Sequence, residues 1–181
     1  MAHINEFVEK ISDILVKQKA LSDQQAIDLK KGFKDVSPIN FEAYLLESSQ
    51  VSKASLLKAL STYYKLPAFD VSGYLFEHDL LRQLPKDVML RNNCIPVEVD
   101  QDILVVVASE PSDDLAVTLE RFLKNDIQFN VGLAQDIKNA VEEFYDEAPT
   151  EDPSEDPYYR EEEETERIEK ILDTEDKKDL L

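Results

Sequence analysis

The residue types that most often do chemistry are too sparse in this sequence to support a common catalytic site. His3 and His78 are far apart and lack a neighbouring cysteine or a His-Glu-x-x-His spacing, so neither a metal site nor a nucleophile–base pair is indicated. The three glycines form neither a Gly-x-x-x-x-Gly-Lys loop nor a Gly-x-Gly-x-x-Gly turn, the usual phosphate cradles. Carboxylates are abundant, but abundance alone indicates a solvated surface. We therefore expect no catalytic residue, no metal and no cofactor.

Composition also excludes several classes of partner. With a net charge of −19, the chain lacks the clustered Lys and Arg that nucleic acids and anionic lipids require. No apolar run approaches the ~20 residues of a membrane helix, and the N-terminus lacks the basic start and apolar body of a signal peptide. The single Cys94 fits a reducing compartment, and we expect it to be a buried residue at the start of a strand. These features predict a cytoplasmic protein without nucleic-acid binding or membrane insertion.

The elements that would position any site begin with an internal repeat, which predicts a duplicated helix-turn-helix unit. The segment 14–22 and the segment 44–52 each contain an apolar triplet, a short gap and a hydrophobic residue before a serine. Capping serines predict helix starts at Ser22, Ser37 and Ser52. The first helix, expected to run to about Lys19, carries one apolar face made of Ile4, Phe7, Val8, Ile11, Ile14 and Leu15. Residues 1–66 are thus predicted to form a four-helix N-terminal subdomain.

Shorter elements follow, and they predict a small α+β subdomain over residues 67–145. Residues 95–99 and 103–108 indicate a β-hairpin whose second strand is apolar enough to be central. Alternation predicts a strand over 127–131, and a helical period predicts a last helix over 135–145. A short strand is also expected over 68–71. The predicted fold class is α+β with a short mixed or antiparallel sheet.

Residues 146–181 differ from the rest in charge. They hold sixteen acidic and five basic residues, a net charge of −11. Three prolines stand among the first acidic residues, which predicts a linker or tail without a core of its own. One short amphipathic helix is possible in it at 160–173.

The ordered elements of the second subdomain resemble a known family. The segments that carry this resemblance are Leu66-Pro67, Leu84-Pro85, Ile95-Pro96-Val97, residues 104–108 with Pro111 and Asp113 following, Arg121-Phe122, and residues 137–145. Over residues 4–145 the chain resembles the MshEN-like N-terminal domain of type II secretion and type IV pilus assembly ATPases, the GspE, PilB and MshE group. In that family the domain precedes the ATPase and docks it to the inner-membrane machinery, and in the MshE-type branch it binds cyclic di-GMP.

The repeat corresponds to the family's tandem cyclic di-GMP motif, but the residues that bind the ligand in that motif are replaced here. The resemblance places the motif's Arg-Leu-Gly and second glycine at Lys10, Ile11, Ser12 and Lys19, and in the second copy at Asn40, Phe41, Glu42 and Ser49. The final glutamine of each copy is Phe33 or Tyr63. Glycine lets a backbone approach a ligand closely, and arginine gives planar bidentate contacts that asparagine cannot. We therefore expect cyclic di-GMP to bind weakly or not at all.

The leading hypothesis is a non-catalytic docking or regulatory domain, peripheral to the bacterial inner membrane through its partners. Its expected partner is a cytoplasmic domain of an inner-membrane platform protein, and Phe7 and Ile11 on the first helix are the candidate docking residues. The same apolar stripe also fits a buried core. One alternative is a cyclic di-GMP sensor with a degenerate motif; another is a stand-alone adaptor or effector that uses its acidic tail. Any ATPase activity would belong to a longer parent protein.

Overall fold

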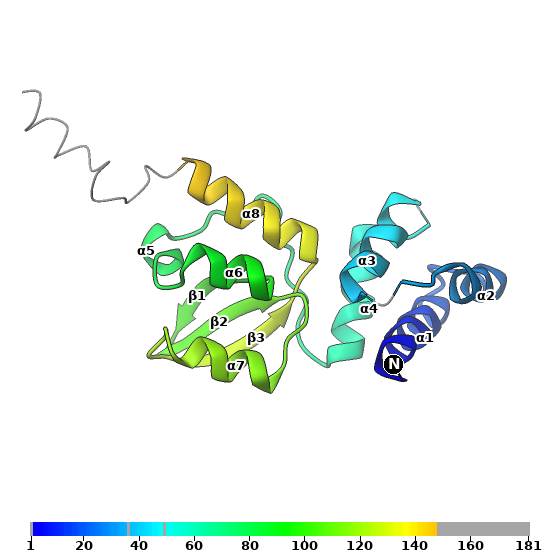
Figure 1. The fold of residues 1–181 in the computed structure, drawn as a ribbon, viewed down its shortest axis with the longest axis horizontal. Coiled ribbons are helices and arrows are strands. Elements are labelled where there is room, and N and C mark those ends of the chain that lie inside the picture. The colour runs from blue at the N-terminus through cyan, green and yellow to red at the C-terminus, as the bar shows by residue number, and fades with distance from the viewer. Residues whose placement is uncertain (1, 36, 49, 148–181) are drawn as a thin grey trace, which may run out of the picture. The chain divides into compact units, whose positions relative to one another are not determined.

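The computed structural model describes residues 2–35, 37–48 and 50–147 of the 181-residue chain (Figure 1). Residues 1–141 form one compact unit, and residues 142–181 are assigned to a second. The described residues contain eight helices and one three-stranded sheet, so the predicted α+β class is confirmed. The predicted division at residues 66 and 145 remains a prediction. The helix expected at 160–173 lies outside the described residues.

The second, third and fourth of the first four helices begin where the serine caps predict. They are α1 (Ala2–Lys17), α2 (Asp23–Gly32), α3 (Pro38–Glu47) and α4 (Lys53–Tyr64). The side chains of Ser22, Ser37 and Ser52 each accept a hydrogen bond from the backbone N–H three residues later, at 3.1, 3.5 and 3.2 Å. At Ser22 the bond is reciprocated, because the Gln25 side chain accepts from the Ser22 N–H at 2.8 Å. Each cap satisfies an amide that the first helical turn leaves without a partner.

The apolar face of α1 forms the core of this helical region. Ile11 and Leu15 are fully buried, and α1 packs against α2, α3 and α4. Leu45 of α3 and Leu60 of α4 are buried in the same cluster, which extends to Val131 at the end of the last strand. The helices therefore share one interior with the adjoining end of the sheet, because burying apolar side chains together removes them from water.

The second half of the unit is built on the sheet. Its elements are α5 (His78–Leu81), α6 (Lys86–Asn92), β1 (Cys94–Asp100), β2 (Ile103–Ala108), α7 (Asp113–Glu120), β3 (Asp126–Val131) and α8 (Ala134–Glu147). β2 lies between β1 and β3 (Figure 1), antiparallel to β1 and parallel to β3, so the sheet is mixed. Gln101 and Asp102 both have positive φ, the conformation that matches a tight turn to the twist of a hairpin. The predicted hairpin and its central strand are confirmed.

The strand expected over 68–71 forms only a single bridge. Ala68 pairs with Val131, flanked by a bond from Phe69 N to Val131 O and one from Val131 N to Pro67 O, both 2.9 Å. The pairing stops because the chain turns away: the Asp70 carboxylate accepts the Ser72 N–H at 3.0 Å, and Gly73 follows with a φ of 74°. Apolar alternation alone could not indicate this turn.

Candidate functional site

The first copy of the repeat lies on α1 and presents only one of its first three motif residues to solvent. Lys10 is exposed and pairs with Glu6 one turn earlier. That hydrogen bond and charge raise the pKa of Lys10 above its ordinary value. Ile11 and Ser12 are both buried, and the Ser12 hydroxyl has no hydrogen-bond partner among the described residues. Part of the motif therefore lies on the face of α1 that points into the core.

Lys19 has a backbone conformation that favours glycine. Its φ is 61°, in the left-handed region that glycine adopts most readily. It ends α1 in the way glycine commonly does: the Lys19 N–H bonds to Val16 O, and the Ala20 N–H bonds to Leu15 O, both at 2.9 Å. The side chain is exposed. The turn between α1 and α2 thus has a glycine-like conformation at a lysine.

The second copy of the repeat begins on α3 and divides between surface and interior. Asn40 is exposed, and its amide donates to the Asp35 carboxylate at 2.7 Å. Phe41 is fully buried. Glu42 is only 5% exposed, so its side chain does not lie at a solvent-exposed ligand surface. Ser49 lies outside the described residues.

Glu42 is the chemically most unusual residue among these positions. Its Oε2 accepts the backbone N–H of Ala134, the first residue of α8, at 3.2 Å. Burial raises the pKa of Glu42 to about 8; the Ala134 bond opposes this rise, and the carboxylates of Glu110 and Asp136 add to it. Asp136 is itself paired with Lys53 at 3.0 Å. Sequence reasoning missed this contact because its partners are 92 residues apart.

Phe33 and Tyr63, at the final glutamine positions of the two copies, belong to a continuous series of aromatic rings. The successive contacts join Tyr44, Phe33, Phe41, Phe7, Tyr63 and Tyr64, with ring centroids 4.9 to 6.2 Å apart. Such tilted and edge-to-face pairs are favourable beyond their buried area. The replaced glutamines have therefore become packing residues. The series reaches solvent at Tyr44, which is 40% exposed.

The structure places the two candidate docking residues in the interior. Phe7 is 4% exposed and Ile11 is 0% exposed, within the core shared by α1, α3 and α4. Phe7 also contacts the rings of Phe41 and Tyr63. An apolar period locates the buried face of a helix but does not say what covers it. Here the helical region covers it, so substituting either residue would test folding before docking.

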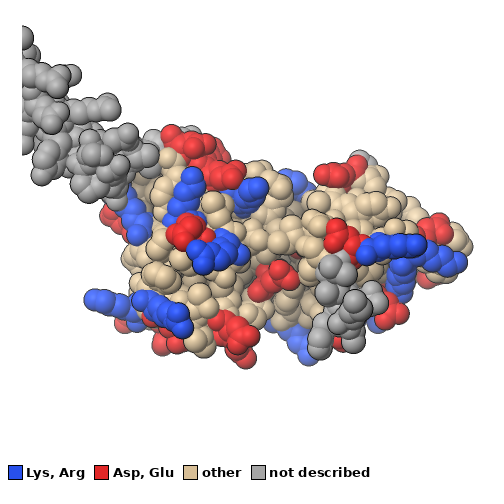
Figure 2. Space-filling model, viewed as in Figure 1, with Lys and Arg blue, Asp and Glu red and all other residues tan. Residues whose placement is uncertain are grey.

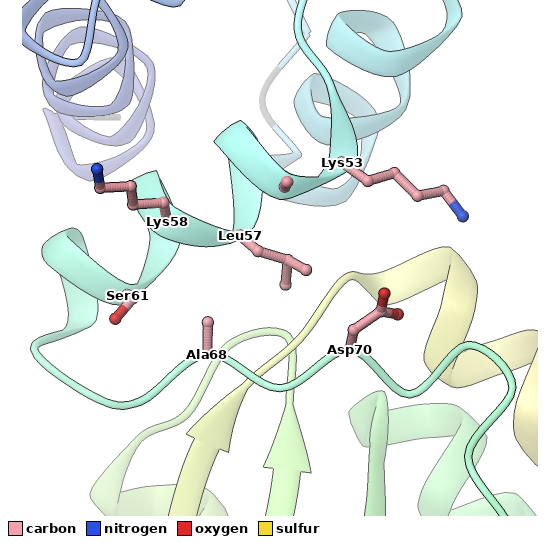
Figure 3. A pocket seen from close by; sticks show the side chains of 7 residues that line it. Lys53, Leu57, Lys58, Ser61, Ala68 and Asp70 are labelled. Carbon is pink, nitrogen blue, oxygen red and sulfur yellow. The ribbon is translucent and has the colours of Figure 1, made fainter.

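An open groove lies between α4 and the segment that bridges to β3. It is lined by Lys53, Ala54, Leu57, Lys58, Ser61, Ala68 and Asp70 and has a volume of about 610 Å³. In Figure 3, Leu57 points from α4 towards the segment carrying Ala68 and Asp70. Apolar and polar side chains both line the groove, and the ammonium group of Lys53 is paired with Asp136. No pattern in the sequence indicated it, because the turn at Asp70 creates one of its walls.

The structure gives little support for metal or nucleophilic chemistry. No group of three His, Cys, Asp or Glu side chains suited to a metal ion occurs in the part of the chain that the structure describes. Cys94 begins β1 and is buried, as expected, and burial raises its pKa to about 12, so its nucleophilic thiolate form is suppressed. Figure 2 shows positive and negative side chains interspersed on one face. None of the described helices is long and apolar enough to cross a membrane.

Comparison with known proteins gives these features a family context. Residues 64–151 match the MshEN domain. The chain is 26% identical over 141 residues to the type IV pilus assembly ATPase PilB of Myxococcus xanthus strain DK1622, covering 76% of this chain and 24% of the ATPase. The chain thus spans about a quarter of the length of that relative.

Two solved structures share the fold. A structure of MshE with cdg has a TM-score of 0.56 and 21% identity, covering 75% of this chain and 98% of the other. The N-terminal domain of XpsE has a TM-score of 0.52 and 20% identity, covering 74% and 92%. These matches confirm the predicted resemblance to the N-terminal domain of type II secretion and type IV pilus assembly ATPases.

The comparisons also correct one expectation. We predicted that cyclic di-GMP would bind weakly or not at all, but the matching MshE structure was solved with cdg, cyclic di-GMP, and the domain family is MshEN. The prediction was drawn from the replaced motif residues. Ligand contacts that use the backbone depend on its conformation, and Lys19 has the left-handed conformation that glycine adopts most readily.

Proposed function

We propose that this chain is a non-catalytic docking and regulatory domain that connects a secretion or pilus assembly ATPase to a cytoplasmic domain of an inner-membrane platform protein. The observation that carries this proposal is the extent of the matches. The chain accounts for nearly all of the matching XpsE N-terminal domain but only about a quarter of the PilB ATPase. A domain of this kind contributes binding surfaces rather than phosphoryl-transfer chemistry.

The exposed end of the aromatic series is the docking surface that we propose for the helical region. Tyr44 is 40% exposed, and its ring lies 5.6 Å from that of Phe33, which is partly buried. Exposed aromatic side chains next to a rigid core are common anchors of protein interfaces, because they bury a large area at little cost in conformational entropy. Mutations that test docking should therefore be made at Tyr44 rather than at Phe7 or Ile11.

A binding assay with a matched control tests the proposal. The purified chain and its Tyr44→Glu variant are titrated with the cytoplasmic domain of the platform protein, and Val117→Glu serves as the control. Val117 is an exposed apolar residue on α7, 57% accessible, so it receives the same change outside the helical region. We expect Tyr44→Glu to weaken binding at least about tenfold, a typical loss for an interface anchor, and Val117→Glu to leave it unchanged. Equal binding by all three proteins would reject this surface.

Cyclic di-GMP sensing is a second candidate function, favoured by the MshE match and by the glycine-like turn at Lys19. Isothermal titration of the chain with cyclic di-GMP tests it directly. Asn40→Arg restores an exposed motif position, and Asn40→Lys is its control, because lysine supplies the charge without the planar guanidinium. We expect binding that Asn40→Arg strengthens more than Asn40→Lys does. No heat of binding from any of the three proteins would reject this function.

A further inference from the structure

A buried carboxyl group joins two distant parts of the compact unit. Glu42 lies on α3, and the N–H that it accepts belongs to Ala134 at the start of α8. The intervening chain includes α4, the whole sheet and α7. Glu42 is thus a side-chain contact between the helical region and the element that follows the last strand. No salt bridge to Glu42 occurs in the described part of the chain.

The groups around Glu42 are mostly negative or uncharged. Asp136 faces it from α8, Glu110 from the segment after β2, and Tyr64 from the end of α4. Burial and nearby carboxylates raise the pKa of Tyr64, so this phenol stays neutral at physiological pH. The nearby cation, Lys53, is engaged by Asp136 at 3.0 and 3.3 Å. A carboxylate at position 42 would therefore be buried without a counter-ion of its own.

Two opposing effects act on this carboxyl group. The N-terminus of α8 and the Ala134 N–H favour the ionised form. Desolvation and the two neighbouring carboxylates favour the neutral form, and they prevail, because burial is the largest influence on Glu42. Because burial disfavours the ionised form, ionisation of Glu42 favours states in which α3 and the start of α8 separate and water hydrates the group.

We propose that Glu42 is a protonation-dependent latch: its neutral carboxyl group holds α3 against the start of α8, and its ionisation releases that contact. The latch would let the helical region shift against the sheet without unfolding either. This device is independent of the docking partner and of any nucleotide ligand.

The linkage between Glu42 and stability has a definite sign. The ordinary pKa of a glutamate, 4.5, applies to the unfolded chain, and the folded value is raised to about 8. Between these values the folded state holds a proton that the unfolded state has released. The contribution of Glu42 is therefore fully present below pH 4.5 and is lost as the pH rises towards 8.

Nuclear magnetic resonance on the full chain tests the latch at two atoms. The ¹³C shift of the Glu42 carboxyl group and the amide shift of Ala134 should titrate together, with a midpoint more than one pH unit above 4.5. In Glu42→Gln, which keeps an acceptor oxygen but cannot ionise, the Ala134 amide shift should stay constant. Glu47→Gln, an exposed change on the same helix, should leave the midpoint unchanged.

Substitution of neighbouring charged residues distinguishes the latch from a purely structural role of Glu42, because only a titrating Glu42 would change its midpoint. Glu110→Gln removes a negative neighbour and should lower the Glu42 midpoint. Lys53→Met leaves Asp136 without its ion pair and should raise the midpoint. At pH 8.5, amide exchange at residues 134–137 should be at least about tenfold faster in the wild type than in Glu42→Gln. A tenfold change in the opening equilibrium is expected when the pKa of Glu42 differs by one unit between the closed and the open state.

A Glu42 carboxyl group that titrates near 4.5 in the wild type would overturn the proposal, and this measurement needs no variant. Equal exchange in the wild type and Glu42→Gln at pH 8.5 would also overturn it. So would an Ala134 amide that titrates in the same way in both proteins.

Discussion

Gly132 lies against Val107 so closely that a methyl group on Gly132 would come within 2.5 Å of the Val107 Cγ1 atom and 3.2 Å of the Phe69 carbonyl oxygen. Val107 is buried on the central strand, so its side chain has little room to yield. We expect Gly132→Ala to lower the free energy of unfolding by about 1–3 kcal/mol, the usual cost of overpacking a core, as measured by urea denaturation.

Gly32 provides the matched control for that experiment. It is the last residue of α2, and an added Cβ there would meet nothing within 4 Å. Gly32→Ala should leave stability unchanged or raise it by up to about 1 kcal/mol, because alanine favours a helix more than glycine does. The same chemical change should therefore destabilise the chain at Gly132 and not at Gly32; equal destabilisation at both positions would contradict the close packing of Gly132.

Lys19 should be more stable as glycine. A residue with a side chain is strained at a φ of 61°, and the Lys19 side chain is exposed, so little packing is lost. We expect Lys19→Gly to raise the free energy of unfolding by about 0.5–1 kcal/mol. Lys19→Ala, which keeps the Cβ and the strain, should not. A thermal melt of the three proteins tells them apart, and a gain from alanine equal to that from glycine would show that the lysine charge, not the backbone, is the cause.

The capping box at Ser22 should contribute measurably to stability. Ser22→Ala removes the hydroxyl that accepts the Gln25 N–H at 3.1 Å, and we expect a loss of about 1 kcal/mol. Gln24→Ala is the control, because Gln24 bonds only to the exposed Asp28 side chain on the same helix at 3.0 Å. Chemical denaturation should show a clear loss for the first variant and a change within about 0.5 kcal/mol for the second.

Cys94 should be unreactive until the protein opens. Burial raises its pKa to about 12, so at pH 8 nearly all of the group is the thiol rather than the reactive thiolate. We expect a chromogenic disulfide reagent to label the native chain at pH 8 only slowly, and to label it at once in denaturant. Rapid labelling of the native chain would mean that β1 is accessible, contrary to its burial here.

Local signals in the sequence predicted much of this fold, because their causes are local. The spacing of Ser22 and Gln25 sets a helix start, and the residues between 99 and 103 set a hairpin turn. The same signals could not show what lies beyond one element. The stripe at Phe7 and Ile11 indicated an apolar face, but its burial depends on three other helices.

The candidate site was less predictable than the fold, because its contacts join residues far apart in the chain. The sequence places Glu42 at a motif position, yet its partner is an amide 92 residues away. The groove beside α4 depends on where the chain turns at Asp70. The motif position at Lys19 holds a lysine in place of glycine, and the sequence alone did not show that this lysine has a positive φ.

The bond between Glu42 and Ala134 also has a consequence for the order in which the chain matures during synthesis. The four helices are complete at Tyr64, whereas Ala134 is made seventy residues later. Until then Glu42 has no amide to bond, and Val131 has not yet joined the shared interior. Glu42 therefore gains its backbone partner only after β3 and the start of α8 have been made. The interior that the helices share with the end of the sheet can close only at that stage.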